Sequence, residues 1–204
     1  MARSLKDILH MMGHFLKSPQ QIGAVAPSSR FLARRMMDTL NLDQASTIVE
    51  LGAGTGAITT ELLQRTGPSS KIMIIDSNPA AVSILRQRLA GRSNLFIVEG
   101  DARELKNILK VHNFGKVDAV VSSLPYASLG ENITRHILSA AAESLTPNGH
   151  FVAFQYTPIL RKTLENYFHI QSSSVVLRNF PPAIVYGCVS RHSSQKTAEL
   201  REIA

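Results

Sequence analysis

From residue 46 onward, short apolar runs alternate with segments of helical periodicity, and this alternation strongly restricts the possible fold. The apolar runs, rich in Val and Ile, predict buried strands at residues 46–51, 71–76, 94–100, 116–123 and 149–156. The segments between them predict helices. Strands that alternate with helices of this length form βαβ units with right-handed crossovers. The sequence therefore predicts an α/β fold with a mostly parallel sheet, followed by two final strands at about 168–177 and 183–190.

The same pattern divides the 204-residue chain into three parts. We expect a domain over residues 41–191, an amphipathic helical extension over residues 1–40 and a frayed polar tail over residues 192–204. The extension is expected to begin with a helix at residues 4–17. Its apolar stripe consists of Leu5, Ile8, Leu9, Met12, Phe15 and Leu16. Such a helix either packs on the domain or lies in the headgroup layer of an anionic membrane, and its residues alone leave both open.

Composition narrows the functional classes. The chain has 22 Lys and Arg against 15 Asp and Glu, a net charge of +7, which predicts an anionic partner: nucleic acid, an acidic membrane surface or a phosphorylated substrate. No stretch reaches the roughly 18 apolar residues that span a bilayer. The single cysteine, Cys188, is typical of a reducing cytoplasm and excludes a cysteine-rich metal site. We expect no metal.

A glycine-rich loop follows the first predicted strand. Gly52, Gly54 and Gly56 lie between this strand and a helix, and Glu50 stands two residues before them. Glycines let the backbone bend tightly and approach a ligand closely. The spacing G-x-G-x-G differs from the G-x-G-x-x-G fingerprint of dinucleotide-binding proteins.

Carboxylates follow the second and third predicted strands. Asp76 lies 20 residues beyond Gly56, where an acid can accept both hydroxyl protons of a ribose or, alternatively, favour a helix dipole. Asp101 can face an adenine amino group across the same cleft or cap the next helix. Together the three loops predict a nucleoside-binding crevice, to which we also assign Ser77 and Ala102.

This set of loops resembles that of the class I S-adenosylmethionine-dependent methyltransferases, over roughly residues 46–190. The resemblance lies in IVELGAGTG at 48–56, IID at 74–76 and EGDA at 99–102. It implies a Rossmann-like, seven-stranded sheet with order 3-2-1-4-5-7-6 and an antiparallel last strand. It also implies S-adenosylmethionine as cofactor, with S-adenosylhomocysteine as product.

In that family the glycine loop packs against the methionine part of the cofactor. The resemblance therefore implies that Asp76 holds the ribose, that Asp101 holds the adenine and that Glu50 supports the loop or the amino-acid end.

The acceptor is expected after the fourth predicted strand, where residues 122–126 read SSLPY. Methyl transfer requires that a neutral lone pair be aligned with the methyl carbon. We expect Ser123 to orient an amine, and Tyr126 to line the path of a cationic product or relay a proton, as the catalytic residues. Ser122 joins the cofactor-binding set.

Two subfamilies of these methyltransferases have an acceptor loop similar to this one. The rRNA adenine dimethyltransferases have Asn-Leu-Pro-Tyr/Phe, whereas this chain has Ser123 in place of the amide, and they usually carry a C-terminal helical domain. The soluble bacterial phospholipid N-methyltransferases resemble this chain over residues 15–190. That resemblance lies in the front segment at 17–36, in FQYTP at 154–158 and in NFPPA at 179–183.

The second resemblance implies methylation of phosphatidylethanolamine towards phosphatidylcholine by a cytoplasmic protein held peripherally at the membrane through residues 3–17. Tyr156 is expected to line the amine pocket, and Arg178 with Asn179 to bind the phosphodiester headgroup. An ornithine lipid or another membrane amine is an alternative acceptor. RNA adenine N6-methylation is the alternative reaction, and a non-catalytic lipid- or nucleic-acid-binding module is a third hypothesis. No DNA partner is expected.

Overall fold

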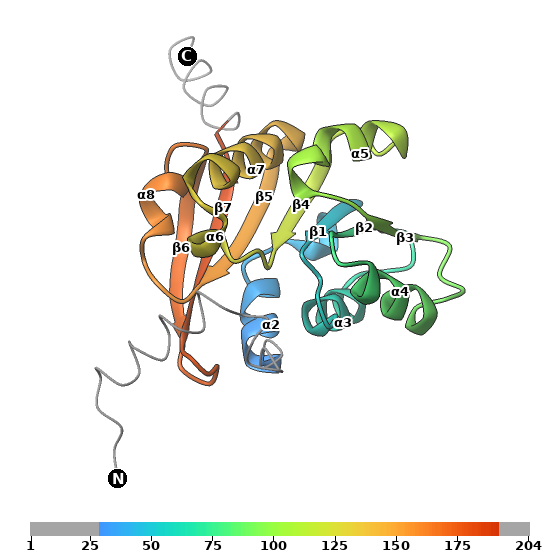
Figure 1. The fold of residues 1–204 in the computed structure, drawn as a ribbon, viewed down its shortest axis with the longest axis horizontal. Helices are drawn as coiled ribbons and strands as arrows, with labels where there is room; N and C mark the ends of the chain where they lie inside the picture. The colour runs from blue at the N-terminus through green and yellow to red at the C-terminus, as the bar shows by residue number, and fades with distance from the viewer. Residues whose placement is uncertain (1–28, 192–204) are drawn as a thin grey trace.

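Seven strands form one mixed sheet in the computed structural model, which describes residues 29–191 of the chain (Figure 1). The strands are β1 (Thr47–Leu51), β2 (Lys71–Asp76), β3 (Leu95–Glu99), β4 (Val117–Ser122), β5 (Leu145–Gln155), β6 (Phe168–Val176) and β7 (Ala183–Ser190). Their order is β3-β2-β1-β4-β5-β7-β6, and β7 runs antiparallel to both of its neighbours. The fold class and strand order that the resemblance implied are confirmed.

Helices cover both faces of this sheet. They are α2 (Arg30–Met37), α3 (Ala57–Arg65), α4 (Pro79–Arg88), α5 (Leu105–Val111), α6 (Tyr126–Leu129), α7 (Glu131–Ser144) and α8 (Leu160–Leu164). One face packs against α2, α3 and α4, and the other packs against α5, α7 and α8 (Figure 1). Because both faces are covered, the central strands are apolar on both sides, which explains their continuous hydrophobic runs.

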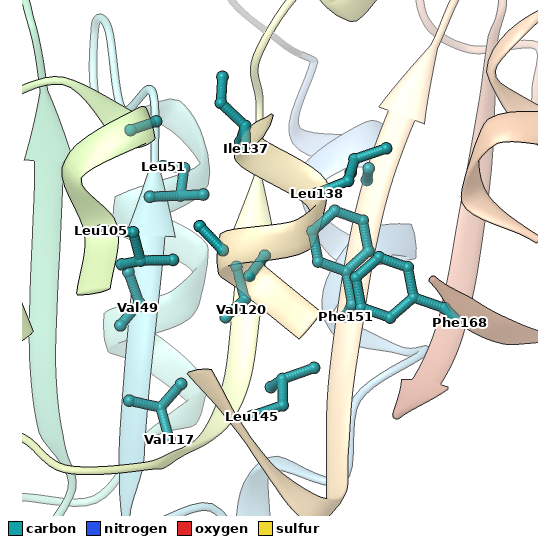
Figure 2. Close-up of a cluster of buried hydrophobic side chains, with 14 of the residues drawn as sticks. Val49, Leu51, Leu105, Val117, Val120, Ile137, Leu138, Leu145, Phe151 and Phe168 are labelled. Carbon is teal, nitrogen blue, oxygen red and sulfur yellow. The ribbon is translucent and has the colours of Figure 1, made fainter. Parts of the chain in front are cut away.

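Figure 2 shows the core on the face covered by α5 and α7. Val49 and Leu51 of β1 lie beside Leu105 of α5 there. The rings of Phe151 and Phe168 stack, with centroids 4.5 Å apart and planes 10° from parallel. These contacts fix the sheet and its helices as one rigid support for the loops at the strand ends.

Helix α2 belongs to the stretch that we assigned to an N-terminal extension. Ser29 caps it by accepting a hydrogen bond from the Leu32 N–H, and Leu32, Met36 and Met37 are buried in the same core as the sheet. The predicted helix at 4–17 and the predicted tail at 192–204 lie outside the described residues. Among the described residues, no helix is both long enough and apolar enough to span a bilayer.

Some boundaries differ from the sequence prediction. Strand β5 begins at Leu145, four residues before the expected start, because residues between Leu145 and His150 form a bulge opposite β4 and the strand continues through it. The short helix α6 lies within a predicted loop, and the short helix α8 was also not predicted. Helices of four or five residues are too short to show a hydrophobic period.

Candidate active site

The loops after β1, β2, β3 and β4 lie side by side at the carboxyl edge of the sheet. Backbone hydrogen bonds continue the strand ladder into these loops. Gly52 N donates to Ile75 O at 2.9 Å, Gly100 N to Asp76 O at 3.0 Å and Ser123 N to Leu51 O at 2.9 Å. The glycine loop, the two acidic loops and the acceptor loop therefore form one continuous surface, as the sequence predicted for an open parallel sheet.

The glycine loop adopts a backbone that other residues rarely take. Gly54 has φ +52° and Gly56 has φ +78°, both in the left-handed region. A Cβ at Gly56 would lie 2.7 Å from the Leu85 side chain of α4, so this glycine is required for helix packing. A Cβ at Gly54 would meet no heavy atom within 4 Å. The space over Gly54 is thus open for a ligand to approach the backbone.

Arg88 of α4 braces this loop, a contact that the sequence analysis missed. Its Nη1 donates to the carbonyl oxygen of Thr55 at 3.1 Å. An arginine on the exposed face of a helix gives no signal in the sequence that it reaches back to a loop 33 residues earlier.

Asp76 joins the end of β2 to the glycine loop. One carboxylate oxygen, Oδ2, accepts from Gly54 N at 2.7 Å, and Oδ1 accepts from Asn78 N at 2.8 Å. Each carboxylate oxygen has two lone pairs, so the group keeps acceptor capacity for hydroxyls of a ligand. Ser77 lies beside it and is exposed. Asp76 therefore lies beside the glycine loop at the carboxyl edge, and its contact with a ribose stays a prediction.

Asp101 lies on the neighbouring loop, where its carboxylate contacts Arg103. It accepts from the Arg103 backbone N–H at 2.8 Å and pairs with the guanidinium at 2.6 Å. The Arg103 side chain, helped by this backbone bond, holds the pKa of Asp101 below its usual range despite partial burial. Asp101 therefore caps the turn at Ala102–Glu104, the alternative considered from the sequence, while it faces the same edge as Asp76. Ala102 is buried against the core.

Glu50 is a fully buried carboxylate at the base of the glycine loop. Its exposed fraction is 0%, and neither oxygen has a hydrogen-bond partner among the described residues. Burial raises its pKa to about 7; the nearby Thr59 hydroxyl opposes this rise and the charge of Asp76 adds to it. An unpartnered buried carboxylate is costly. It can be satisfied by a ligand that brings a cationic or hydrogen-bond-donating group.

Tyr126 does not occupy the position expected of a catalytic residue. Its side chain is 3% exposed, and its hydroxyl shares a 2.7 Å hydrogen bond with Ser122 Oγ, which is also buried. Burial raises the pKa of Tyr126 far above its usual value. The Tyr126–Ser122 pair thus anchors the acceptor loop to the core, so neither residue shows a free group for the substrate or the cofactor in this arrangement. The sequence could not indicate that the ring turns inward.

We expect Tyr126→Phe to keep the predicted methyl transfer within about fivefold of the wild-type rate and to lower stability by about 1 kcal/mol, because it removes one internal hydrogen bond. Turnover and chemical unfolding of the purified variant measure both effects. A loss of about 100-fold or more in turnover at unchanged fold would restore Tyr126 as the proton acceptor.

Ser123 lies at the end of β4, and its role at the acceptor stays a prediction. Its Oγ is buried and has no hydrogen-bond partner among the described residues. Its N–H donates to the Leu51 carbonyl, which fixes the backbone of Ser123 and so the position of its hydroxyl relative to an acceptor group. The next residue, Leu124, is held through its carbonyl oxygen by Gln155 Nε2 at 2.9 Å.

Gln155 is a further residue of the site, and no role was predicted for it from the sequence. This residue is 5% exposed at the end of β5, and its amide reaches across to the acceptor loop. A polar residue at the end of an otherwise apolar strand is the signal that could have identified it. By fixing the Leu124 carbonyl, Gln155 positions the loop that contacts the acceptor.

We expect Gln155→Leu to lower kcat about 10- to 100-fold while the cofactor Kd stays unchanged, because a small shift of the acceptor loop misaligns the reacting groups. Steady-state kinetics and calorimetry separate the two quantities. Gln171→Leu, the same change on the exposed face of β6, is the control and should leave both unaltered. If Gln155→Leu lowers kcat and the affinity for the cofactor by the same factor, a positioning role for Gln155 is contradicted.

The side-chain amide of Asn179 forms hydrogen bonds within the protein. Its Oδ1 accepts from Ser29 N at 3.0 Å, and its Nδ2 donates to the Pro181 carbonyl at 2.7 Å. Its side chain also hydrogen-bonds the Tyr156 hydroxyl. The amide that we expected to bind a headgroup is therefore engaged in fastening α2 to the turn between β6 and β7. This role could not be predicted, because the contact that ties the turn to α2 joins residues 150 positions apart in the sequence.

Tyr156 and Arg178 lie near the same edge. Tyr156 is half-buried just beyond β5 and packs edge-on against Phe154, with centroids 5.6 Å apart. Arg178 is exposed, and its guanidinium lies 5.1 Å from the ring centroid of Phe31. The predicted contacts of these two residues with a substrate stay predictions.

Comparisons with known proteins show which proteins this chain resembles. A family model described as a methyltransferase domain matches residues 48–149. An ornithine lipid N-methyltransferase from Singulisphaera acidiphila is 33% identical over 185 residues, which cover 90% of this chain and 96% of that protein. A probable ribosomal RNA small subunit methyltransferase A from Methanosarcina mazei is 36% identical, but the match covers 51% of this chain and 34% of that longer protein.

Among solved structures, the fold is similar to that of the N-methyltransferase NodS from Bradyrhizobium japonicum WM9, in complex with S-adenosyl-L-homocysteine. The TM-score is 0.65 at 16% sequence identity, and the superposition covers 90% of this chain and 98% of that chain.

Proposed function

Because the chain belongs to the class I S-adenosylmethionine-dependent methyltransferases, we propose that it methylates the amino headgroup of a membrane lipid. The observation that carries this proposal is the extent of the match with the ornithine lipid N-methyltransferase, which takes in 90% of this chain and 96% of that protein. The likeness to the ribosomal RNA methyltransferase of Methanosarcina mazei takes in 51% of this chain and about a third of that protein.

The residues at the carboxyl edge fit S-adenosylmethionine. When bound, this cofactor supplies an electrophilic methyl group on a sulfonium. The open space over Gly54 admits a ligand to the backbone, and Asp76 has free lone pairs for the ribose hydroxyls. The unpartnered carboxylate of Glu50 suits the cationic amino-acid end.

The acceptor side is built on the loop after β4. Ser123 offers an unpartnered hydroxyl and Leu124 a carbonyl oxygen held by Gln155, and oxygen acceptors of this kind can orient the N–H groups of a neutral amine. These two oxygen atoms align the amine, because the nucleophile needs only a lone pair directed at the methyl carbon. The amine must be neutral before it attacks, so we expect methyl transfer to rise with pH.

Phosphatidylethanolamine is the substrate that the sequence resemblance predicts, and ornithine lipid is the substrate in the name of the relative. Both headgroups carry a primary amine, but only the first carries a phosphodiester. Arg178 is the exposed guanidinium near the site edge that could bind that phosphodiester. The reaction would take place at the cytoplasmic face of the membrane, with residues 3–17 as the proposed peripheral contact.

The test offers labelled S-adenosylmethionine to the purified protein with three acceptors: vesicles containing phosphatidylethanolamine, vesicles containing ornithine lipid, and unmethylated ribosomal RNA. Label in a lipid phase, absent for Asp76→Ala, is the expected result, and the labelled vesicle identifies the headgroup. Label in neither lipid contradicts the proposal.

Methylation of RNA adenine is the second candidate function. The likeness to ribosomal RNA methyltransferases and the net charge of +7 favour it, whereas Ser123 in place of an amide does not. Label in the RNA of the same experiment would establish it and overturn the lipid proposal.

A further inference from the structure

The turn between β6 and β7 exposes an unusual group of hydrophobic side chains. Val175, Leu177 and Phe180 are 59%, 77% and 62% exposed, and they lie within six consecutive positions. The other large hydrophobic residues exposed between residues 29 and 191 are separated from one another: Ile84, Val111, Ile133 and Ile159. Single exposed apolar residues are ordinary, but a group of them marks an interaction surface. We call residues 175–182 the hairpin tip.

The neighbourhood of the hairpin tip is basic. Neither α2 nor the stretch from residue 168 to 191 contains an Asp or a Glu. The guanidinium groups of Arg30 and Arg178 each lie 5.1 Å from the ring centroid of Phe31, which gathers two cations between α2 and the tip. Arg35 adds a third, because its Nε donates to Ser174 Oγ at 2.7 Å. An apolar projection with arginines behind it complements an anionic lipid surface, in which phosphates lie above acyl chains.

The hairpin tip lies at the same edge of the sheet as the candidate active site. Strand β7 is antiparallel to both β5 and β6, so β6 runs parallel to β5 and ends at the carboxyl edge. Figure 1 shows the turn between β6 and β7 projecting at that edge, beside α2. A surface that contacts the tip would therefore also face the glycine loop and Ser123.

The hairpin tip is also held in place from within. Asn179 donates to the Pro181 carbonyl and accepts from Ser29 N, so the turn is tied both to itself and to the start of α2. Pro181 is buried while Phe180 is exposed, which turns the aromatic ring outward. A preorganised loop loses little conformational freedom when it binds.

We propose that the hairpin tip inserts into the headgroup region of an anionic lipid bilayer, with Leu177 and Phe180 in the apolar layer and Arg30 and Arg178 at the phosphates. The contact would present the carboxyl edge of the sheet to the membrane. This inference rests on the proposed lipid substrate, and it adds a docking surface separate from residues 3–17.

The chain contains no tryptophan, so a single introduced Trp reports on one position. Leu177→Trp labels the hairpin tip, and Val111→Trp is a matched control, because Val111 is 76% exposed at the end of α5, just before the chain enters the amino end of β4. The full chain is mixed with vesicles of phosphatidylcholine and phosphatidylglycerol, which contain no primary-amine lipid. We expect the emission of the Leu177→Trp variant to shift to the blue and to be quenched by brominated acyl chains, and the emission of the Val111→Trp variant to stay unchanged.

A second pair of variants measures the contribution of the tip. Leu177→Asp combined with Phe180→Asp should weaken sedimentation with these vesicles at least about tenfold, because two apolar side chains that enter the bilayer are replaced by charges that the anionic surface repels. Val111→Asp should bind as the wild type does. Equal binding by all three proteins overturns the proposal.

The remaining outcomes are equally decisive. If the tryptophan emission of Leu177→Trp is already blue-shifted in buffer, another part of the chain covers the hairpin tip, and the proposal is overturned. If the emission responds to ribosomal RNA but not to vesicles, the hairpin tip contacts RNA, and the proposal is likewise overturned. Phosphatidylethanolamine or ornithine lipid is then added with labelled S-adenosylmethionine. Methyl transfer by Leu177→Trp without quenching of its tryptophan overturns the docking surface and leaves the function, whereas insertion without transfer to either lipid overturns the function and leaves the docking surface.

Discussion

Replacing Asp76 with Ala is expected to lower the affinity for S-adenosylhomocysteine at least about 100-fold and to abolish measurable methyl transfer. The carboxylate positions the glycine loop through Gly54 N at 2.7 Å and has lone pairs left for the ribose hydroxyls. A hydrogen bond to a charged group contributes about 1.5–3 kcal/mol, so the loss of two to a ligand exceeds the roughly 2.7 kcal/mol that corresponds to about 100-fold. Calorimetric titration with S-adenosylhomocysteine measures the change.

Asp118→Ala is the matched control. Asp118 Oδ2 also accepts backbone hydrogen bonds, from Ser46 N at 2.9 Å and Thr47 N at 3.0 Å, but at the opposite edge of the sheet. This variant should lose stability and keep its affinity for S-adenosylhomocysteine within about threefold, because it touches no part of the site. If Asp76→Ala binds within about tenfold of the wild type, the carboxylate does not hold the ribose and the cofactor site is wrongly assigned.

The parts of the site that the sequence could predict are those whose position depends on the backbone. Asp76 is the last residue of β2 and Gly54 follows β1. Adjacent parallel strands end at the same edge, so strand patterns alone place the two residues together. The α/β class and the mostly parallel sheet were predictable for the same reason, because continuous apolar runs and helical periods are local signals. The strand order was implied by the family resemblance.

The parts that could not be predicted depend on the direction of a side chain or on a distant partner. Tyr126 was expected at the substrate, but its ring packs in the core and its hydroxyl bonds Ser122. Asn179 was expected at the headgroup, but its amide ties the hairpin tip to Ser29, 150 residues earlier. Gln155 and Arg88 hold the site loops through contacts of 31 and 33 residues in sequence separation. Residue type alone does not specify such partners.

Glu50→Gln is expected to remove a pH dependence from the stability of the protein. The pKa of Glu50 rises from 4.5 to about 7 on folding, chiefly because burial disfavours the charged form. The native state therefore binds this proton more tightly than the unfolded state, and the contribution of Glu50 to stability falls as pH rises from 4.5 to about 7. At roughly 1.36 kcal/mol for each pKa unit, the ionised group costs about 3 kcal/mol above pH 7.

The variant isolates this contribution, because the other titrating groups are the same in both proteins. Urea unfolding of the wild type and of Glu50→Gln should give similar free energies near pH 4.5. The variant should then become more stable than the wild type by about 3 kcal/mol above pH 7. A difference that does not change with pH would show that Glu50 is not the buried, unpartnered group described above.

Glu61→Gln is the control, and it should change the free energy of unfolding in the opposite direction. Glu61 is also buried, at 9% exposure, but its carboxylate pairs with Arg65 at 2.8 Å and lies 3.7 Å from Arg34. Removing that charge takes a carboxylate away from both arginines, of which Arg65 keeps Asp38 at 2.5 Å, so this variant should be less stable than the wild type near pH 7, by about 1–3 kcal/mol. Stabilisation by Glu50→Gln together with destabilisation by Glu61→Gln would show that Glu50 lacks a partner within the chain.

The same carboxylate should respond to the cofactor. A cationic amino group beside Glu50 favours its ionised form, so binding below about pH 7 should release a proton. The binding enthalpy of S-adenosylhomocysteine at about pH 6 should therefore depend on the ionisation enthalpy of the buffer in the wild type and much less in Glu50→Gln, which should also bind about tenfold or more weakly. A variant that is more stable than the wild type and yet binds cofactor more poorly would mean that Glu50 is kept charged for the ligand at the expense of the fold.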